Sequence, residues 1–496
     1  MSVLNILKYK KMKRINPTAI KCLARLSVLP LLIQGCNAQA QPKPNFVFIL
    51  IDDMGYSDVG CFGSDYYETP NIDRLASQGM KFTSAYAAST LSSPTRSSIL
   101  TGKYPGRLHI THAIPIQGYK RLGNGTATPL KDADYVMNLP LEEVTIAEAL
   151  KPAGYATISI GKWHVCDEES YFPEYQGFDR NVGGNGHGNT ENYFYPYHNK
   201  WRMAPDYPWI EWNTLPDGKP GEYITDRLTE EAVKFIEENK DRPFFLYLPH
   251  YAVHTPIQAI DSILRKYEAK PADTVKGHTK PGYAAMIESV DISMGVILKK
   301  LEELGLDDNT IVIFTSDNGG HGRWTSNWPW RGNKGNFYEG GIRVPLIIRW
   351  PGKTKPGSVC DVPVISTDFY PTMLEMANMN LLPEQHKDGL SLIPLLKNSG
   401  SLNRSDLYWH FPNYTGTGHP DPSGPLSVIR HDNWKLIENF EDGKLELYDL
   451  KNDPKESVNL ADQKPELAGK LRDMLVKWRN ETGVQMPEVN PDYVKK

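Results

Sequence analysis

FVFILIDD, residues 46–53, sets the fold expected of this chain. Its six apolar residues show no polar alternation, which predicts a strand covered on both faces, as in the centre of a parallel sheet. Asp52 and Asp53 follow directly at the strand end. Because open α/β sheets bind their ligands outside the carboxyl ends of their strands, these two acids indicate a functional edge.

Four further apolar runs have the same character, at residues 155–160, 244–248, 310–315 and 344–349. An amphipathic helix precedes the run at 310–315 and stops at Gly305. Its apolar stripe consists of Met286, Val290, Ile297, Leu301 and Leu304. Strands that alternate with helices predict a doubly wound α/β domain with a large, mostly parallel mixed sheet over residues 41–403.

Residues 404–496 have a different pattern, in which short strand-like runs lie close together with turn residues between them. These runs are residues 407–411, 426–430, 434–437 and 445–448. A last helix carries Leu467, Leu471, Leu475 and Trp478 at helical spacing. We therefore expect a smaller C-terminal subdomain, an antiparallel sheet with one helix packed on it.

The first forty residues are typical of a signal peptide, because basic residues precede an apolar run, 26–33, that is too short to span a bilayer. Two cleavage sites fit. Gly35-Cys36 resembles a lipobox and would leave a lipidated Cys36, whereas Ala38-Gln39-Ala40 suits ordinary signal peptidase. Met12 offers an alternative start. We expect export from a bacterial cytoplasm, either to a periplasmic form or to a lipoprotein whose contact with the membrane is a lipid anchor at Cys36.

Charge and cysteine content exclude two classes of protein. Without residues 1–40 the chain has 48 Lys and Arg against 59 Asp and Glu, a net charge of −11. A surface this acidic argues against nucleic acid as a partner. Only Cys61, Cys166 and Cys360 remain beyond residue 40, so no disulfide framework is implied.

Reactive side chains follow the other predicted strands as well. Lys162 and His164 follow the run at 155–160, and His254 follows the run at 244–248. The run at 310–315 is followed by Asp317-Asn318-Gly319-Gly320. A single acid after a strand is usually a helix cap or a turn former. Four such strand ends together predict one reactive edge.

Asp52, Asp53, Asp317 and Asn318 offer only oxygen ligands, which suit a hard cation such as Ca²⁺ or Mg²⁺ better than zinc. The alternative is an Asx-turn role for Asp317 and Asn318 before the two glycines. We favour the metal, because two adjacent acids at a buried strand end need compensating charge.

A signature at residues 92–102 gives the most specific indication of function. It reads SSPTRSSILTG and resembles the maturation motif of the formylglycine-dependent sulfatases of the alkaline phosphatase superfamily, close to arylsulfatases and N-acetylgalactosamine sulfatases. The family's other motifs follow in order, with resemblances at Asp52-Asp53, Gly161-Lys162-Trp163-His164, His254-Thr255-Pro256, Ser316-Asp317-Asn318-Gly319, Arg331-Gly332-Asn333-Lys334 and Leu447-Tyr448-Asp449-Leu450.

The resemblance implies that Ser92 is oxidised to formylglycine by a radical-type maturing enzyme before export. Ser92 stands where many relatives have Cys, so it is either native to a serine-type bacterial member or a substitution. The family pattern also implies one Ca²⁺ ion. Its ligands would be Asp52, Asp53, the modified Ser92, Asp317 and Asn318.

The family's catalytic roles carry over to matched positions. Arg96 would hold the aldehyde hydrate, and Lys162 and Lys334 would neutralise the sulfate. His164 would handle the proton of the second hydroxyl, and His254 would protonate the departing alcohol. The hydrate is needed because one of its hydroxyls attacks sulfur while the other later expels sulfate, which an unmodified serine cannot do.

The predicted substrate is a sulfated saccharide, cleaved by an exo-acting glycan sulfatase. Residues 193–212 are rich in Tyr and Trp, which suits either stacking on sugar rings or packing of a long excursion. Side chains beside the matched motifs are expected to contact the sugar: His187, Arg323, Trp324 and Asn327.

Two alternatives remain open. The first is a phosphomonoesterase or phosphodiesterase of the same superfamily, which would need a site for two metal ions built from many His and Asp ligands. A glycan-binding lipoprotein in which Ser92 is never matured would bind sulfated glycans without releasing sulfate.

Overall fold

The computed structural model describes residues 43–114, 128–197, 214–415 and 423–495. Residues 42–496 form one compact unit. The predicted signal peptide with Cys36, and the second half of the aromatic segment at 193–212, lie outside the described residues. Among the residues that are described, no helix has both the length and the apolar character needed to cross a membrane.

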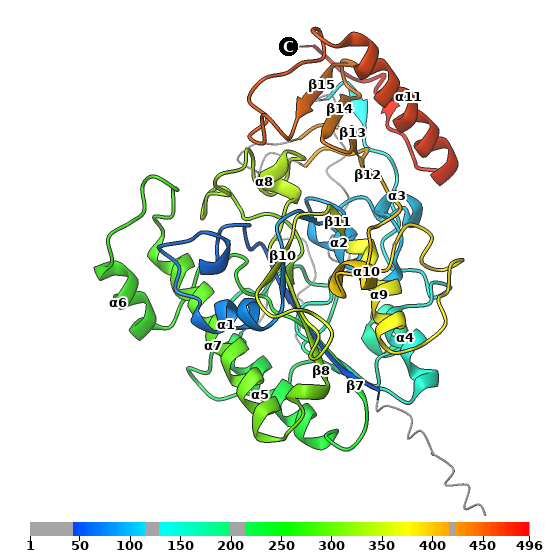
Figure 1. The fold of residues 1–496 in the computed structure, drawn as a ribbon. Coiled ribbons are helices and arrows are strands. Elements are labelled where there is room, and N and C mark those ends of the chain that lie inside the picture. Colours follow the sequence, from blue (N-terminus) through cyan, green and yellow to red (C-terminus); the bar gives the residue numbers. More distant parts are fainter. Residues whose placement is uncertain (1–42, 115–127, 198–213, 416–422, 496) are drawn as a thin grey trace, which may run out of the picture. The chain divides into compact units, whose positions relative to one another are not determined.

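An eight-stranded sheet forms the centre of the larger part (Figure 1). Its strand order is β10-β2-β9-β8-β1-β7-β5-β6. The strands are β1 (Asn45–Ile51), β2 (Met80–Phe82), β5 (Ala156–Ile160), β6 (Arg180–Val182), β7 (Phe244–Pro249), β8 (Thr310–Ser316), β9 (Leu346–Arg349) and β10 (Ser358–Cys360). The predicted large, mixed and mostly parallel sheet is confirmed.

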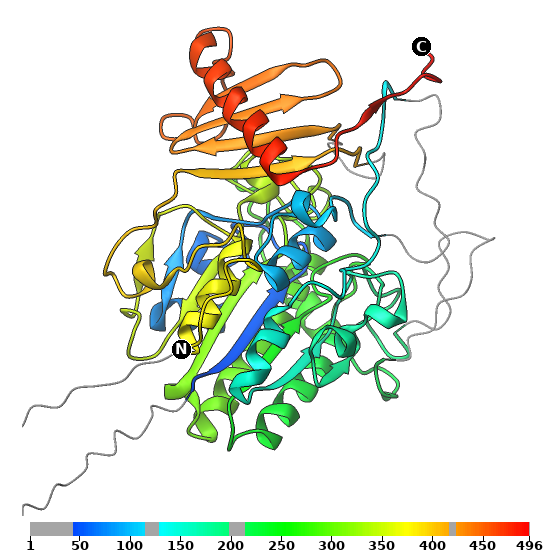
Figure 2. The ribbon, with the colours of Figure 1, turned by 90° about the vertical axis from the view of Figure 1, so that its right-hand side faces the viewer.

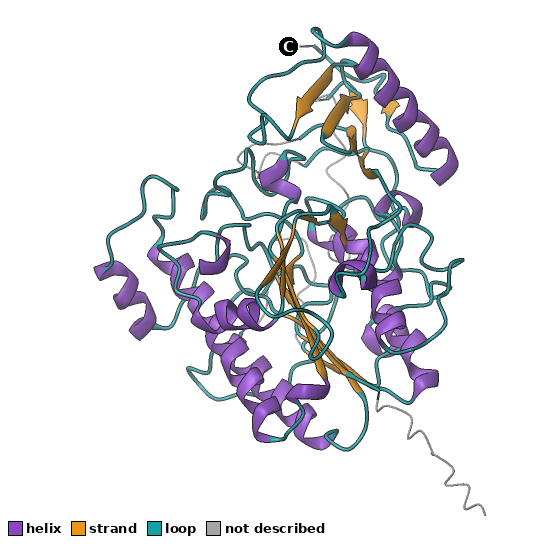
Figure 3. Cartoon of the chain, in the orientation of Figure 1, coloured by secondary structure: helices purple, strands orange, loops and turns teal. Residues whose placement is uncertain are grey.

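Helices cover both faces of this sheet, which Figure 3 shows edge-on. Alternate side chains of β1 enter two separate apolar clusters, with Val47, Ile49 and Ile51 in one and Phe48 in the other. Each cluster is completed by helices, so both faces of the strand are apolar and no polar alternation develops. The α-helices described in the larger part are α1 (Pro70–Gln78), α2 (Ser92–Thr101), α3 (Pro105–Leu108), α4 (Ile146–Leu150), α5 (Ile224–Glu238), α6 (Asp261–Ala269), α7 (Pro281–Glu303), α8 (Glu339–Ile342), α9 (Phe369–Met376) and α10 (Ile393–Leu396).

The direction of one strand differs from the prediction. The run at 344–349 was expected among the central parallel strands, but β9 pairs antiparallel with both β8 and β2. Strands buried on both faces carry the same apolar pattern in either direction. Only the connection between β8 and β9 decides which way the chain returns.

A four-stranded antiparallel sheet with one helix makes up the C-terminal part, as predicted (Figure 2). Its elements are β12 (Asp406–Phe411), β13 (Leu426–His431), β14 (Trp434–Asn439), β15 (Leu445–Asp449) and α11 (Pro465–Thr482). Leu471 and Leu475 of α11 share an apolar cluster with this sheet and with Tyr86 and Phe337 of the larger part. Two short pairs complete the structure, β3 (Ala85–Tyr86) with β11 (Val364–Ile365) and β4 (Leu130–Lys131) with β16 (Glu488–Val489).

Candidate active site

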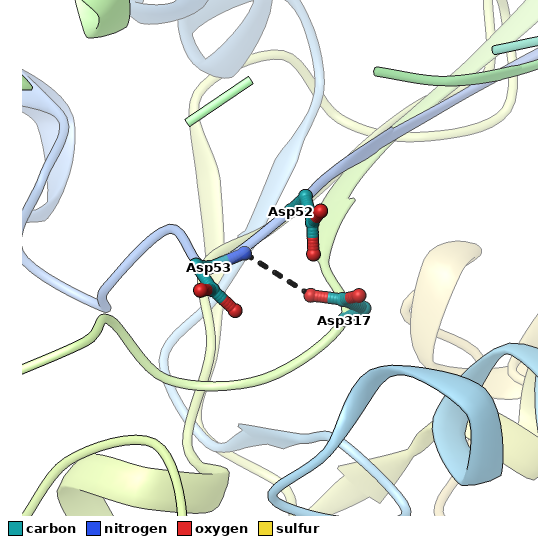
Figure 4. Close-up of side chains that lie close together, drawn as sticks. All are labelled: Asp52, Asp53 and Asp317. Atoms are coloured by element: carbon teal, nitrogen blue, oxygen red, sulfur yellow. Dashed lines mark hydrogen bonds between the residues drawn. The ribbon is translucent and has the colours of Figure 1, made fainter. Parts of the chain in front are cut away.

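Three carboxylates meet where β1 and β8 end. The two strands are parallel neighbours with Ile51 opposite Ser316, so Asp52, Asp53 and Asp317 leave the sheet side by side. Their ligand oxygens all lie within 4.8 Å of one another. Figure 4 shows the three side chains turned toward a common point, with the Asp53 N–H donating to Asp317 Oδ1 at 3.2 Å.

The turn that carries Asp53 is held in an uncommon conformation. Asp53 has a φ of 60°, in the left-handed region that non-glycine residues adopt at a cost of about 1 kcal/mol or more. Its carbonyl accepts a hydrogen bond from the Tyr283 hydroxyl at 3.0 Å, and its carboxylate accepts one from the Asn318 amide at 2.8 Å. The amide oxygen of Asn318 remains available toward Ser92.

Ser92 is the first residue of α2, and this helix brings it to the three acids. Its hydroxyl donates to Asp52 Oδ1 at 3.2 Å and accepts from Lys162 Nζ at 3.1 Å. Arg96 lies one helical turn further on. Its guanidinium donates two hydrogen bonds to Asp317 Oδ2, from Nε at 3.0 Å and from Nη2 at 2.9 Å. A third, from Nη1, reaches the carbonyl of Lys162 at 2.8 Å.

Each acid has a cationic partner. Lys162, just after β5, contacts Asp52 Oδ2 at 2.7 Å, and Lys334 contacts Asp53 Oδ1 at 2.6 Å. Because the four side chains are buried, these charges act on one another with little screening. Burial, together with the neighbouring carboxylates, raises the pKa of Asp52 to about 7 despite the opposing effect of Lys162.

Burial and the neighbouring carboxylates shift the pKa values of the two lysines in opposite directions. Burial lowers the pKa of Lys162 to about 8, although Asp52 opposes this. Burial also disfavours charge on Lys334, yet Asp53 and Asp52 together hold the pKa of this lysine above its ordinary value. Lys334 is therefore the more firmly charged of the two.

Two histidines lie beside this cluster in defined tautomers. His164 Nε2 lies 3.0 Å from the carbonyl of Ile114, and since a carbonyl only accepts, Nε2 carries the proton and Nδ1 the lone pair. By the same reasoning, His254 Nδ1, 2.9 Å from the Thr255 carbonyl, is protonated. His254 Nε2 then faces Asp53 Oδ2 at 3.6 Å.

Both histidines are neutral in this arrangement. Burial, followed by the charges of Lys162 and Arg96, holds the pKa of His164 well below its ordinary value. Burial and the charge of Lys334 lower the pKa of His254 to about 3. His250, which also follows β7, turns away from the site and contacts the Ser293 hydroxyl of α7 at 3.2 Å.

Comparison with known proteins agrees with this geometry. The Sulfatase family model matches residues 44–379, and a model described as N-sulphoglucosamine sulphohydrolase, C-terminal, matches residues 327–481. A sulfatase of Formosa agariphila is 34% identical over 95% of this chain and 97% of its own length. The chain belongs to the sulfatase family.

Other relatives of this sulfatase fit the same assignment. N-acetylgalactosamine-6-sulfatase of Mus musculus is 34% identical over 77% of this chain and 71% of its own length. The crystal structure of Ps i-CgsB in complex with k-i-k-neocarrahexaose has a TM-score of 0.73 and 30% identity, and the match covers 88% of this chain and 92% of that one. The protein is thus a sulfuric ester hydrolase.

The predicted sugar contacts lie in different environments. In this sulfatase Arg323 is exposed and Trp324 half-buried, both on the loop after β8. Asn327 is buried and uses both ends of its amide on the backbone of Gly320, at 2.8 and 2.9 Å, so it braces this loop. His187 is buried beside Gly188, whose backbone lies against the ring of His164.

The described part of the aromatic segment packs inward. Tyr193 is fully buried in a core cluster, and its hydroxyl donates to the carbonyls of Tyr251 and His254 at 2.7 and 2.8 Å. Tyr193 therefore holds the turn that presents His254. For this half of the segment, packing rather than sugar stacking is the role that the structure shows.

Two residues outside the predicted set belong to the site. His321 follows directly on Gly319-Gly320 after β8 and is partly buried. Burial lowers the pKa of His321, with Asp53 opposing and Lys334 adding to the effect. Asp58 is buried beneath the Asp53 turn and accepts from the Gly55 N–H at 2.7 Å and the Tyr283 hydroxyl at 2.6 Å. In the sequence, only their positions shortly after the acidic motifs indicated them, Asp58 after Asp52-Asp53 and His321 after Asp317-Asn318.

Proposed function

We propose that this sulfatase is an exo-acting glycan sulfatase that uses formylglycine made from Ser92 and one bound Ca²⁺ ion. The observation that carries the proposal is the position of Ser92. Its hydroxyl lies within hydrogen-bonding reach of both a carboxylate, Asp52, and an ammonium group, Lys162, at the meeting point of three acids and three cations.

The donor set fits a hard cation. Asp52, Asp53 and Asp317 supply carboxylate oxygens, Asn318 supplies an amide oxygen, and no nitrogen or sulfur ligand lies among them. When bound, calcium would lower the pKa of the attacking hydroxyl and draw negative charge from the sulfate oxygens. Lys162 and Lys334, which contact two of these carboxylates now, would then be free to turn toward the sulfate.

Formylglycine would supply two hydroxyls on one carbon, one to attack sulfur and one to expel sulfate afterwards. Arg96 fixes the position of Asp317 relative to Lys162, because its guanidinium donates hydrogen bonds to the Asp317 carboxylate and to the Lys162 carbonyl. Lys162 and Lys334 would stabilise the charge that develops on the sulfate oxygens in the transition state. Before substrate binds, the carboxylates offset the cost of burying these cations.

The histidines divide the proton transfers. His164, neutral and with its lone pair on Nδ1, is suited to accept the proton of the second hydroxyl. His254 is neutral before substrate binds. An anionic sulfate ester beside Nε2 would raise the pKa of His254, which would allow it to protonate the leaving alcohol.

A glycan substrate has support from the saccharide held by the related Ps i-CgsB structure. Export, maturation by a radical-type enzyme before export, and a lipid anchor at Cys36 or a soluble periplasmic form are further parts of the proposal. They rest on the N-terminal sequence and on Ser92. No role with nucleic acid is proposed.

The phosphatase alternative is less well supported. Among the described ranges, one group of three acids is close enough to hold a metal, and Lys162 and Lys334 lie against it. Metal analysis that finds two zinc ions per chain would favour the phosphatase. The glycan-binding alternative predicts saturable binding to native protein with no sulfate release.

The decisive experiment measures modification and activity on the same sample. Native protein digested with trypsin should give a peptide 82–96 that has lost two hydrogens, and this sample should release sulfate from a panel of defined sulfated saccharides. Chelation followed by calcium return should abolish and restore activity. Full activity with Ser92 unmodified would overturn the proposed mechanism, whereas activity that survives chelation would remove only the metal from it.

A further inference from the structure

A polar cavity lies next to the candidate active site. It has a volume of about 470 Å³ and is formed by residues 277–280 and the loop from 322 to 333. Lys280, Arg323, Trp324 and Trp330 contribute the large side chains of its wall. No Asp or Glu lines it, although the chain as a whole has more acids than Lys and Arg.

The two cations on this wall have no acidic partner in the described part of the chain. Lys280 and Arg323 are both exposed, and neither forms an ion pair there. Lys276, four residues before Lys280, shows the usual alternative, since it pairs with Asp65 and lies over the ring of Trp328. Two unpaired positive charges on one wall favour an anionic ligand.

The wall is held in place by buried hydrogen bonds. The Thr325 hydroxyl donates to Asp58 Oδ1 at 2.7 Å and lies 3.1 Å from the Tyr67 hydroxyl. Asn327 is bound to the backbone of Gly320. A preformed site binds without the entropy cost of ordering a loop, so exposed charges on it are more effective than on a mobile surface.

The cavity adjoins the catalytic residues directly. Asn333 belongs to its lining, and the next residue, Lys334, contacts Asp53. His321 joins the two regions along the chain, because it follows Gly319-Gly320 after β8 and precedes Gly322, which lines the cavity. A saccharide whose sulfate reached Ser92 could therefore continue into the cavity.

We propose that this cavity binds a second anionic group, a sulfate or a carboxylate, on the sugar next to the one that loses its sulfate. The inference rests on the proposed function. Lys280 and Arg323 bind the anion, and Trp324 offers an apolar surface to the sugar ring that carries it. The substrate is accordingly a glycan with an anionic group on neighbouring sugars, not an isolated sulfated sugar.

The test compares three oligosaccharides of equal length with the matured enzyme and a K280A/R323A variant. All carry the reactive sulfate on the terminal sugar, and the neighbouring sugar is neutral, sulfated or a uronate. Wild type should show a KM about tenfold lower for either anionic neighbour, with similar kcat, because the contact is made equally in the ground and transition states. K280A/R323A should lose this advantage, so that its KM becomes similar for all three substrates. The two anionic arms distinguish sulfate from carboxylate.

A charge-matched control removes two exposed cations elsewhere, R265A/K353A, and should keep the preference. Rising salt should reduce the preference of wild type. Equal KM values for all three substrates, or an equal loss in K280A/R323A and the control, would overturn the proposal. If no substrate releases sulfate, the proposed function fails. Calorimetry of unmatured protein with the same three oligosaccharides then still tests the cavity, and equal affinities would reject it.

Discussion

At the level of single residues, each buried acid of the active site is matched with one cation. Lys162 lies on Asp52, Lys334 on Asp53, and Arg96 makes a two-pronged contact with Asp317. A buried charge without a partner is costly, so these pairs allow the site to fold before a metal or a sulfate is bound. When a dication and a sulfate ester bind together, the carboxylates would exchange the lysines for the metal ion, and the lysines would exchange the carboxylates for the sulfate.

Calcium binding should be linked to a proton near neutral pH. In the chain without metal the pKa of Asp52 is about 7, and a carboxyl must be ionised to bind a cation. Because this pKa is raised, the proton must be displaced below pH 7, so the apparent calcium affinity should fall about tenfold per pH unit there and level off above pH 8. Titration calorimetry in buffers of different ionisation enthalpy measures the proton released. A flat affinity from pH 6 to 8 would contradict the prediction.

His254 and Lys162 should respond differently to the leaving group. A sugar alkoxide needs a proton as the S–O bond breaks, whereas nitrophenolate leaves without one. His254→Ala should slow a sulfated sugar by roughly 10²–10⁴-fold and nitrophenyl sulfate much less. Lys162→Ala removes charge stabilisation and should slow both alike. The measurement is kcat/KM at fixed pH, and an equal loss on both substrates for His254→Ala would assign it to sulfate binding.

At the level of elements, the turn after β1 is tied to the loop after β8. Asp58 accepts from Gly55 and Tyr283 on one side and from Thr325 on the other, and His278 Nε2 lies 4.0 Å away. Through Tyr283, which also donates to the Asp53 carbonyl, Asp58 supports one of the proposed metal ligands. Such outer partners orient the ligands that contact the ion.

Asp58→Asn should therefore weaken calcium binding without unfolding the protein. An amide has one acceptor oxygen, so it cannot serve both Tyr283 and Thr325, and we expect calcium affinity to fall by about 10–100-fold. Asp291 is the matched control. It is equally buried but accepts hydrogen bonds from the backbone of Asn71 and Ile72 at the start of α1, and not from Tyr283 or Thr325.

Asp291→Asn should lower the Tm and leave calcium affinity unchanged, measured by calorimetry on the same preparations. If Asp58→Asn lowers the Tm but not the affinity, Asp58 is a structural residue only.

At the level of the whole described unit, a buried charge network joins the C-terminal sheet to the larger part. Lys435 of β14 contacts Glu339 of α8 at 3.1 Å and Glu456 at 2.8 Å, and all three side chains are buried. Burial raises the pKa of Glu456 to about 7, with Lys435 opposing and Glu339 adding to the effect. The network lies beside the apolar cluster shared by the two parts.

Lys435→Met should destabilise this junction strongly. It leaves the buried carboxylate of Glu456 without the cation that it contacts, whereas Glu339 keeps its ion pair with Arg343 at 3.2 Å. Breaking such a buried pair costs about 3–5 kcal/mol. Lys444→Met is the control, because Lys444 is 59% exposed in its pair with Glu446 and should change the unfolding free energy by less than about 1 kcal/mol. Urea unfolding of both variants measures the difference. Similar stabilities would show that the network contributes little.

The sequence by itself determined the elements and the motifs of this sulfatase. Apolar runs marked the strands because burial on both faces removes polar alternation, as in β1 and β8. The acids after those runs were expected at one edge because parallel neighbours end together. The signature from Ser92 to Gly102 indicated the family because its spacing is specific.

Only the tertiary structure decided which side chains touch. Periodicity reports burial, but Asp53 and Lys334 lie 281 residues apart, and their contact depends on strand order and loop path. The same holds for the antiparallel direction of β9, for His250 turning to α7 while His254 faces the acids, and for the cavity beside Arg323. These features come from long-range packing, which a local pattern does not encode.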